Sequence, residues 1–378
     1  MENNVMNPFV VGKYLSDDYF CDREQETEFL IKQIENGRNV ALISPRRMGK
    51  TGLIQHCFAQ KRITESYNSF FVDIYATTSL SEFVFVLGKA IFEGLKPKRI
   101  EWKERFFQVI RSLRMGFKLD AITGEPTFDI SLGDIQSPQT TIDEIFEYLE
   151  TADKPCVVAI DEFQQIGEYA EKNVEALLRT KIQQCRQTQF VFSGSRRHTM
   201  SNMFNSSSKP FYQSAIMMGL EPIPQETYVD FAIRLFEQYG RQINRDVIDM
   251  VYKKYEGFTW FVQMMMNELF ALTPKGETCT VDLLEQAHHN IVQMQEMGFK
   301  EQLASLAPKQ KQLLQAIAKE HGVNGITSSS FIKKYNLPSA SSVQAALKPL
   351  LKSDIVVMTN GFYRIYDYFF ADWIEKEF

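Results

Sequence analysis

The sequence predicts an α/β core with a parallel sheet flanked by helices, then an all-α segment, then a small domain with a two-stranded wing. Three observations support this. Short apolar runs alternate with amphipathic stretches up to about residue 220, as in a parallel sheet covered on both faces. After Glu221 the pattern becomes helical only. Near the end, two β-rich runs flank Asn360-Gly361, the strongest short hairpin signal.

Composition narrows the class of protein. The chain has 378 residues and 44% hydrophobic residues, enough for two or three domains with real cores. Its net charge of −5 gives no overall basic field for nucleic acid. Five cysteines without CxxC spacing argue against zinc ribbons and disulfide frameworks. Without a signal peptide or an apolar run near about 18 residues, we expect a cytoplasmic protein with no membrane contact.

Hydrophobic periodicity gives the elements of the core in order. We expect helices at residues 22–35, 50–62, 79–92, 141–151 and 173–187, and strands at 39–43, 69–75, 155–160, 189–193 and 214–220. The region from about 95 to 138 interrupts this alternation, and we interpret it as an insertion containing a helix and a hairpin, with an exposed strand at 128–132. Its mixed basic and aromatic residues fit a solvated helix face better than a partner contact.

The second half predicts two further domains. Helices are expected at 225–239, 245–255, 259–272 and 282–298, and then at 308–321, 328–334 and 339–353, before strands at 355–359 and 362–366. Three helices and a two-stranded wing describe a winged helix-turn-helix. The predicted division is therefore a core at 1–220 with the insertion at about 95–138, a helical lid at 221–304, and a winged helix-turn-helix domain at 305–378.

Residues 44–52, called the phosphate loop below, have the pattern of a Walker A loop of a P-loop NTPase. An apolar strand leads into the loop and a helix follows it, which is the context that such a loop requires. Lys50 would lie between the β- and γ-phosphates, Thr51 would ligate Mg²⁺, and Gly49 lets the backbone approach. Ser44 stands where glycine is usual. The candidate nucleotide-binding residues of the loop are Pro45, Arg46, Arg47, Met48, Gly49, Lys50, Thr51 and Gly52.

A second motif supports the first. The apolar run 155–160 ends in Asp161 and Glu162, about 110 residues beyond the phosphate loop. Open α/β sheets bind ligands at the carboxyl ends of their strands. In Walker B chemistry Asp161 holds Mg²⁺, and Glu162 orients the attacking water as a general base. The pair of motifs predicts a site for a nucleoside triphosphate, and the absence of a guanine-specific Asn-Lys-x-Asp sequence favours ATP over GTP.

These residues give the chain a family resemblance. It resembles an archaeal-type ATPase of the AAA+ superfamily, within or near the STAND group of signal-transducing NTPases. The matching segments are Phe20-Cys21-Asp22-Arg23-Glu24-Gln25-Glu26, the phosphate loop, Asp161-Glu162, Ser193-Gly194-Ser195-Arg196 and Gly257-Phe258-Thr259-Trp260. The resemblance covers nearly the full length and is weakest at 95–138.

The resemblance implies roles that spacing does not show. Arg23 would lie near adenine and ribose, although an ordinary first-turn helix residue is an equal alternative. Ser195 or Arg196 would sense the γ-phosphate and, with Lys50 and Glu162, complete the catalytic set; a solvated loop is the alternative for Arg196. Family members often carry an arginine where this chain has Gln213-Ser214. Slow turnover, or substitution by another residue, is therefore expected.

We expect a Mg²⁺-dependent ATPase that acts as an ATP/ADP switch on its winged helix. Two alternatives stay open: an ATP-controlled DNA-binding regulator, and a nucleotide-binding scaffold with little turnover. Residues 305–378 hold nine Lys or Arg and six Asp or Glu, but helix 339–353 has only Lys348 and Lys352 as basic residues. DNA affinity depends on phosphate contacts, so an unknown protein partner is favoured over DNA. The oligomeric state is left open, with an oligomer among the alternatives.

Overall fold

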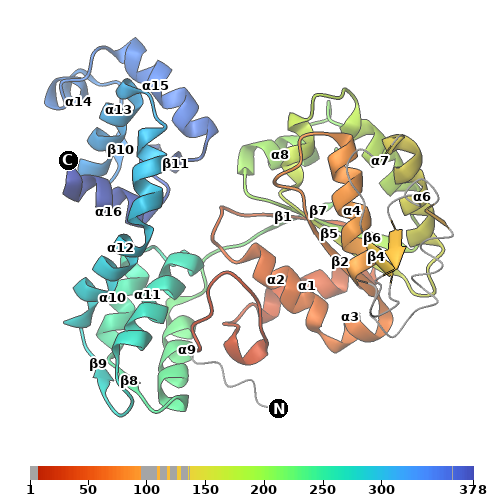
Figure 1. The fold of residues 1–378 in the computed structure, drawn as a ribbon, viewed down its shortest axis with the longest axis horizontal. Helices are drawn as coiled ribbons and strands as arrows, with labels where there is room; N and C mark the ends of the chain where they lie inside the picture. Colours follow the sequence, from red (N-terminus) through yellow and green to blue (C-terminus); the bar gives the residue numbers. More distant parts are fainter. Residues whose placement is uncertain are drawn as a thin grey trace. The chain divides into compact units, whose positions relative to one another are not determined.

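The computed structural model describes residues 7–94, 109–110, 117–119, 126–128, 135, 137–359 and 361–378 (Figure 1). The chain forms two compact units. The core unit comprises Gly12–Ile223, and the second unit comprises Pro224–Phe378 together with the segment that ends at Val11. Each unit is described by itself below. No helix in the described ranges is both long and apolar enough to cross a membrane.

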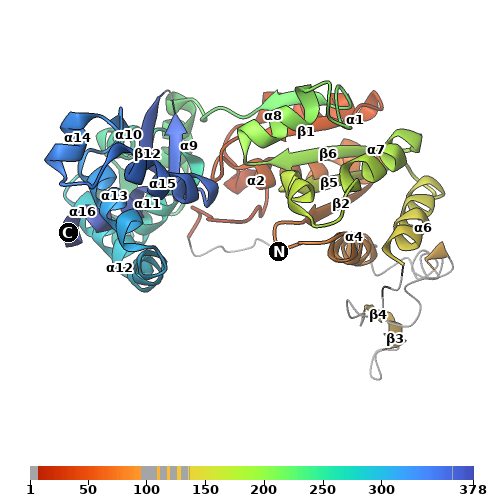
Figure 2. The same ribbon diagram turned by 90° about the horizontal axis from the view of Figure 1, so that it is seen from above.

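The core unit is built on a five-stranded sheet with the order β2-β5-β6-β1-β7, and every neighbouring pair is parallel (Figure 2). The parallel sheet predicted from the sequence is therefore confirmed. Every residue of β1, β5 and β6 is buried, as expected for strands covered on both faces. The strands are β1 Val40–Ile43, β2 Asn68–Asp73, β5 Cys156–Asp161, β6 Thr188–Gly194 and β7 Ile216–Gly219.

Helices surround this sheet (Figures 1 and 2). They are α1 Glu24–Glu35, α2 Lys50–Ala59, α3 Lys61–Ser66, α4 Leu80–Gly94, α6 Pro138–Glu150, α7 Val174–Gln184 and α8 Arg197–Asn205, with short 3-10 helices η1 Asp17–Tyr19 and η4 Phe163–Glu168. The single helix expected at 50–62 is wrong, because Gln60 has extended backbone and separates α2 from α3. Helix α8, which follows β6, was not predicted from the sequence.

Little of the predicted insertion lies in the described residues. Strand β3 (Phe117–Leu119) pairs antiparallel with β4 (Pro126–Phe128), which agrees with a hairpin in this region. Residues 129–132 of the strand expected at 128–132 lie outside the described residues. Most of the region in which a helix was expected also lies outside the described residues.

The second unit starts with helices and continues into a wing of three strands, one more than the two predicted. The helices are α9 Gln225–Gln238, α10 Arg245–Lys254, α11 Thr259–Leu272, α12 Leu283–Ala304, α13 Pro308–Lys319, α14 Ser329–Lys334, α15 Ala340–Lys352 and α16 Tyr368–Glu377. Two short strands pair in parallel: β8 Gln242–Ile243, between α9 and α10, and β9 Thr278–Cys279, between α11 and α12. The wing is a separate sheet with the strand order β10-β12-β11, in which β10 is Val323–Asn324, β11 is Val356–Thr359 and β12 is Phe362–Ile365. The additional strand is β10, which also pairs with β12. The predicted boundary between lid and winged helix, 304/305, stays a prediction.

Helix α16, which the sequence analysis missed, packs against both the lid helices and the winged helix. Asp367 caps it, accepting hydrogen bonds from the backbone N–H groups of Phe369 and Phe370. Its Tyr368 ring lies 5.0 Å from that of Phe261 and 5.5 Å from that of Tyr255. These aromatic contacts give the lid helices and the winged helix one shared core.

The start of the described chain is anchored in the second unit. Phe9 is fully buried, with its ring 5.4 Å from that of Phe236 and 5.9 Å from that of Phe270. Asn267 Nδ2 donates to Phe9 O at 2.7 Å, and Gln263 Nε2 donates to Val10 O at 3.2 Å. The core unit is therefore joined to the second unit by two chain connections, one at each of its ends.

Replacing this anchor should weaken the second unit. We expect Phe9→Ala to lower the free energy of unfolding of this unit by about 3–5 kcal/mol, because the lost ring leaves a cavity in an aromatic core. Urea denaturation followed by the fluorescence of Trp260 and Trp373, with Trp102 replaced by phenylalanine in every variant, measures it. Met250→Ala is the matched control: Met250 lies in the same unit and is 55% exposed, so its change should stay within about 0.5 kcal/mol. Equal effects of the two substitutions would contradict the anchor.

Candidate functional site

The phosphate loop connects β1 to α2 and folds around a lysine. Gly49 has a φ of 90°, a conformation that favours glycine, and Lys50 is the first residue of α2. Lys50 is 6% exposed, and its ammonium donates hydrogen bonds to the carbonyl oxygens of Ser44 at 2.9 Å and Pro45 at 3.0 Å. Ser44, the residue in place of glycine, points its hydroxyl to Leu220 O at 3.3 Å, just after β7. This hydrogen bond links the phosphate loop to the residue that follows β7, which is an edge strand of the sheet.

The surroundings of Lys50 lower its pKa. Burial is the main cause, and the charge of Arg46 adds to it, while Glu162 and Asp161 act in the opposite direction. A buried ammonium of this kind gains from an anion placed beside it. The loop therefore has the donors and the charge that a polyphosphate needs.

The acidic pair lies beside the phosphate loop. Thr51 Oγ1 donates a hydrogen bond to Asp161 Oδ2 at 2.8 Å, across 110 residues of sequence. Asp161 ends β5 and is 7% exposed. The structure thus brings together the two predicted metal-binding residues and places Lys50 within the electrostatic influence of Asp161 and Glu162.

Asp73 is a third acid at this edge, and the sequence analysis missed it. It ends β2 and lies opposite Asp161 in the strand register. Desolvation raises its pKa, as do the charges of Asp161 and Glu162, although the Tyr75 backbone N–H opposes the shift. The sequence contained a usable signal for this acid, because Asp73 directly follows the apolar run 70–72, just as Asp161 follows the apolar run of its own strand.

Glu162 turns sharply out of β5. Its φ of 54° lies in the left-handed region, and its carboxylate Oε2 accepts hydrogen bonds from Ser195 Oγ at 2.7 Å and from Gln164 Nε2. Ser195 comes directly after β6, the neighbour of β5, so the predicted sensor residue does lie at the site. Arg196 Nη1 instead makes an ion pair with Glu168 Oε1 at 3.3 Å. Gln164 was not singled out from the sequence.

Arg23 is held in an unusual backbone conformation. Its φ is 73°, its side chain is 4% exposed, and its Nη1 pairs with Glu26 Oε1 at 2.5 Å. Its Nη2 is buried without a hydrogen-bond partner among the described residues. This combination goes beyond an ordinary first-turn residue, because a buried guanidinium donor left unpaired is costly. A ligand oxygen or ring nitrogen would satisfy it.

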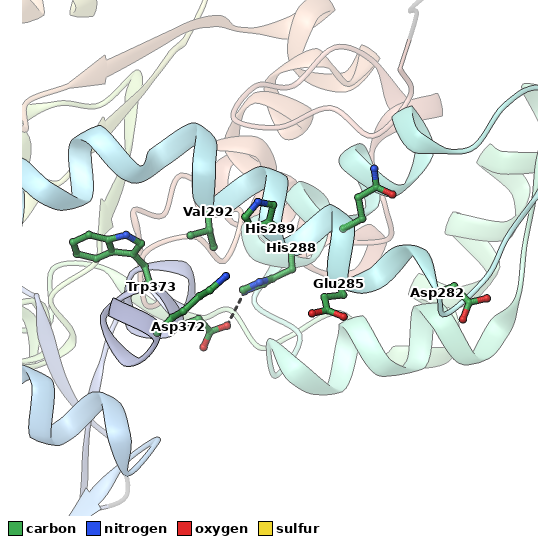
Figure 3. Close-up of a pocket in the computed structure, with 9 residues that line it drawn as sticks. Asp282, Glu285, His288, His289, Val292, Asp372 and Trp373 are labelled. Atoms are coloured by element: carbon green, nitrogen blue, oxygen red, sulfur yellow. Dashed lines mark hydrogen bonds and ion pairs between the residues drawn. The ribbon is translucent and has the colours of Figure 1, made fainter. Parts of the chain in front are cut away.

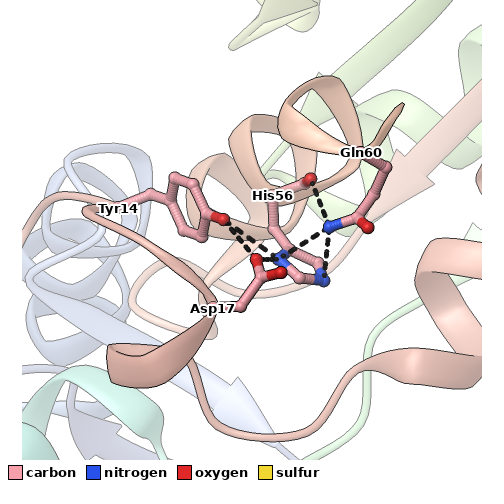
Figure 4. Close-up of polar contacts among 4 residues, drawn as sticks. All are labelled: Tyr14, Asp17, His56 and Gln60. Atoms are coloured by element: carbon pink, nitrogen blue, oxygen red, sulfur yellow. Dashed lines mark hydrogen bonds and ion pairs between the residues drawn. The ribbon is translucent and has the colours of Figure 1, made fainter. Parts of the chain in front are cut away.

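The segment before Arg23 packs on helix α2. The Phe20 ring stacks on His56 with centroids 4.5 Å apart, and a Cβ at Gly52 would lie 3.3 Å from Phe20. Tyr14 OH donates to Asp17 at 2.6 Å, and Asp17 also pairs with His56 Nδ1 at 3.0 Å (Figure 4). Burial lowers the pKa of His56, although Asp17 opposes the shift. The chain around Phe20 thus borders the first turn of α2.

The remaining predicted loop residues are placed as follows. The Arg46 guanidinium carbon lies 5.2 Å from the Tyr75 ring centre, Arg47 has a φ of 63°, and Met48 is 2% exposed. At the position without the expected arginine, Gln213 has a φ of 52°. The placement of these residues does not show what they do, so the catalytic and binding roles assigned from the sequence stay proposals.

A separate pocket of about 580 Å³ lies in the second unit (Figure 3). Residues of both charges line it, among them Glu285, His288, Asp372 and Lys376. Asp372 accepts from His288 Nε2 at 2.8 Å and pairs with Lys254 at 2.8 Å. Burial acts to raise the pKa of Asp372, but these two partners more than offset it and leave the pKa lowered. The contact between His288 and Asp372 joins α12 to α16 at this pocket, which indicates a structural role for the pair.

The parallel sheet, the strand–loop–helix around Lys50 and the acids at the neighbouring strand end define a P-loop ATPase fold. The chain belongs to the family of ATPase domains predominantly from Archaea, whose family model matches residues 20–265. A model for a probable winged helix domain matches residues 297–376. The family and the winged helix inferred from the sequence are thus confirmed.

Solved structures share the fold at low identity. The Walker-type ATPase paby2304 of Pyrococcus abyssi has a TM-score of 0.67 and 19% identity, over 97% of this chain and 99% of that chain. The ORC2 protein of Aeropyrum pernix, solved as ADPNP-ADP complexes, has a TM-score of 0.55 and 14% identity, over 98% and 95%. The ORC1 protein of Aeropyrum pernix, solved in complex with DNA, has a TM-score of 0.53 and 12% identity, over 95% and 93%. None of the curated proteins compared with the chain matches it.

Proposed function

We propose that the core unit binds ATP with Mg²⁺ and hydrolyses it to ADP and phosphate. The observation that carries the proposal is the hydrogen bond of 2.8 Å between Thr51 and Asp161, which joins the phosphate loop to the acidic pair. Lys50, charge-coupled to both acids, completes the constellation. Family membership supports ATP as the nucleotide.

The residues present fit the nucleotide and the metal. Backbone N–H groups at the start of α2 and the Lys50 ammonium would hold the β- and γ-phosphates. The unpaired Nη2 of Arg23 would hold the base or ribose. Thr51 and Asp161 supply oxygen ligands of the kind that Mg²⁺ prefers alongside water and phosphate. When bound, Mg²⁺ would neutralise charge on the transferring phosphoryl group.

Glu162 would take the proton from the attacking water. The water oxygen then bonds to the γ-phosphorus while the bond from this phosphorus to the β–γ bridging oxygen breaks, releasing ADP and phosphate. Ser195 positions the Glu162 carboxylate through their hydrogen bond. Arg196, 26% exposed and paired with Glu168, would have to leave that partner to reach the phosphate. With Gln213 in place of an arginine, turnover is expected to be slow.

Phosphate release from ATP by the full chain, with Mg²⁺ and with a chelator, tests the activity. Tight ATP binding with no release in Mg²⁺ would leave the scaffold alternative. Equal release with and without the metal would remove the metal from the proposal.

We further propose that nucleotide state changes the placement of the second unit, as in a STAND-type switch. Because Tyr255, Phe261 and Tyr368 share one core, the lid helices and the winged helix would move as one body. The two chain connections to the core unit, before Gly12 and after Ile223, would guide this motion. Small-angle scattering with ADP and with a non-hydrolysable ATP analogue should give different profiles, and identical profiles would remove the switch.

DNA binding through the winged helix is the second candidate. Lys348 and Lys352 are exposed and four residues apart on α15, so they lie on one face. The wing, however, exposes Met358 (53%) and Phe362 (49%), which favours a protein partner or an oligomer contact.

A salt titration of duplex DNA binding to the full chain tests this candidate. If the lysines contact phosphates, the double variant Lys348→Ala and Lys352→Ala should reduce the slope of log K against log salt by about 2. The control is the same change at Lys309 and Lys311 of α13, which should leave the slope unaltered. Equal slopes for both double variants would exclude this DNA surface.

A further inference from the structure

We propose that Gln164 is a positioning residue that holds the Glu162 carboxylate in the orientation needed to activate water. This inference rests on the proposed ATP hydrolysis. It assigns a role to a side chain that follows the acidic pair and that the motifs do not include.

The contacts around Glu162 are asymmetric. Oε2 receives both hydrogen bonds, one from Gln164 Nε2 and one from Ser195 Oγ at 2.7 Å. Among the described residues no donor is assigned to Oε1. A carboxylate fixed through one oxygen keeps the lone pairs of the other for a water molecule. The geometry therefore leaves Glu162 both oriented and available as a base.

Burial makes Gln164 a rigid support. Its side chain is 3% exposed, and the second residue of η4 carries it directly behind the turn at Glu162. A Cβ at Gly194 would lie 2.4 Å from Gln164 Oε1 and 2.5 Å from Met200 Cγ, so glycine at the end of β6 is what makes room for this amide. A long side chain with its rotamer locked in this way can hold a partner precisely.

The amide is costly for the fold alone. Gln164 Oε1 is buried and has no hydrogen-bond partner among the described residues. An unpaired buried acceptor destabilises a fold, and an apolar side chain of similar shape would avoid this cost. The hydrogen-bonded end of the amide is its Nε2 group, which donates to Glu162. A neutral donor there orients the carboxylate without adding a positive charge to compete for it.

The test compares variants of neighbouring glutamines in the full chain. Gln164→Met keeps the volume but removes the donor, so kcat for ATP should fall about 10- to 100-fold, with KM and the Kd for ATP unchanged. Gln165→Met is the matched control. Gln165 belongs to the same short helix, but its amide donates to Thr77 O at 3.1 Å, and kcat should be unaltered.

A second variant covers the case in which Gln164→Met misfolds. Gln164→Asn keeps the amide but shortens the side chain by one methylene, so the donor no longer reaches Glu162 Oε2, and kcat should again fall with the Kd for ATP unchanged. A purely structural role would lower the melting temperature without changing kcat. A wild-type kcat in both variants overturns the inference alone. No turnover by the wild type overturns the proposed function and the inference with it.

Discussion

Lys50→Ala is expected to weaken ATP binding by about 10- to 100-fold, the largest effect on affinity that we foresee. The substitution removes a charged donor that is 6% exposed and that would contact two phosphates, and charge-assisted hydrogen bonds carry energies of this order. Calorimetric titration with ATP and Mg²⁺ measures the loss. The rise in melting temperature that ATP gives the wild type should shrink in parallel.

The fold itself should tolerate this change. Burial lowers the pKa of Lys50, so the charged form is disfavoured in the free protein; the alanine relieves that penalty, which offsets the loss of the hydrogen bonds to Ser44 O and Pro45 O. Its melting temperature without ATP should therefore stay close to the wild-type value. Lys61→Ala, an exposed lysine at the start of α3, is the matched control and should keep full affinity. If the Lys50→Ala variant bound ATP as tightly as the wild type, the proposed nucleotide-binding site would be wrong.

Glu162→Gln should lower kcat by about 10²- to 10⁴-fold, the range for loss of a general base, while ATP still binds. The amide keeps the shape of the side chain but cannot take a proton from water. Ser195 Oγ can still donate to the new amide oxygen, so the local structure is kept. Single-turnover phosphate release separates this chemical step from product release.

Glu147→Gln, at an exposed carboxylate of α6 in the same unit, should leave kcat unchanged and controls for loss of charge. Two outcomes contradict the assignment. A variant as fast as the wild type would show that another base acts, with Asp73 the first candidate from its place opposite Asp161. Loss of ATP binding together with kcat would show that Glu162 holds the nucleotide.

Local pattern determined most of the elements. The apolar runs of β1 and β5, the loop before Lys50 and the acids after β5 were all readable, because periodicity and motif chemistry act over a few residues. Helix α16 was missed, although Asp367 before an amphipathic stretch was a usable cap signal. The break at Gln60 was missed because no glycine or proline marks it in the sequence.

Contacts between distant segments were beyond the sequence. Asp73 joins the acidic edge only because β2 pairs with β5 in that register. Gln164 meets Glu162 because the chain takes a left-handed turn at a non-glycine residue. Phe9 is anchored among helices that begin more than 200 residues later in the chain, at Pro224 and beyond.

By itself the sequence determined the class of site, since Lys50, Thr51, Asp161 and Glu162 carry chemistry that few other functions require together. The tertiary structure alone decided how those groups meet: which acid touches Thr51, and which oxygen of Glu162 is held. The physical reason is that strand register and side-chain burial are set by packing over the whole sheet, whereas a motif specifies only its own few residues.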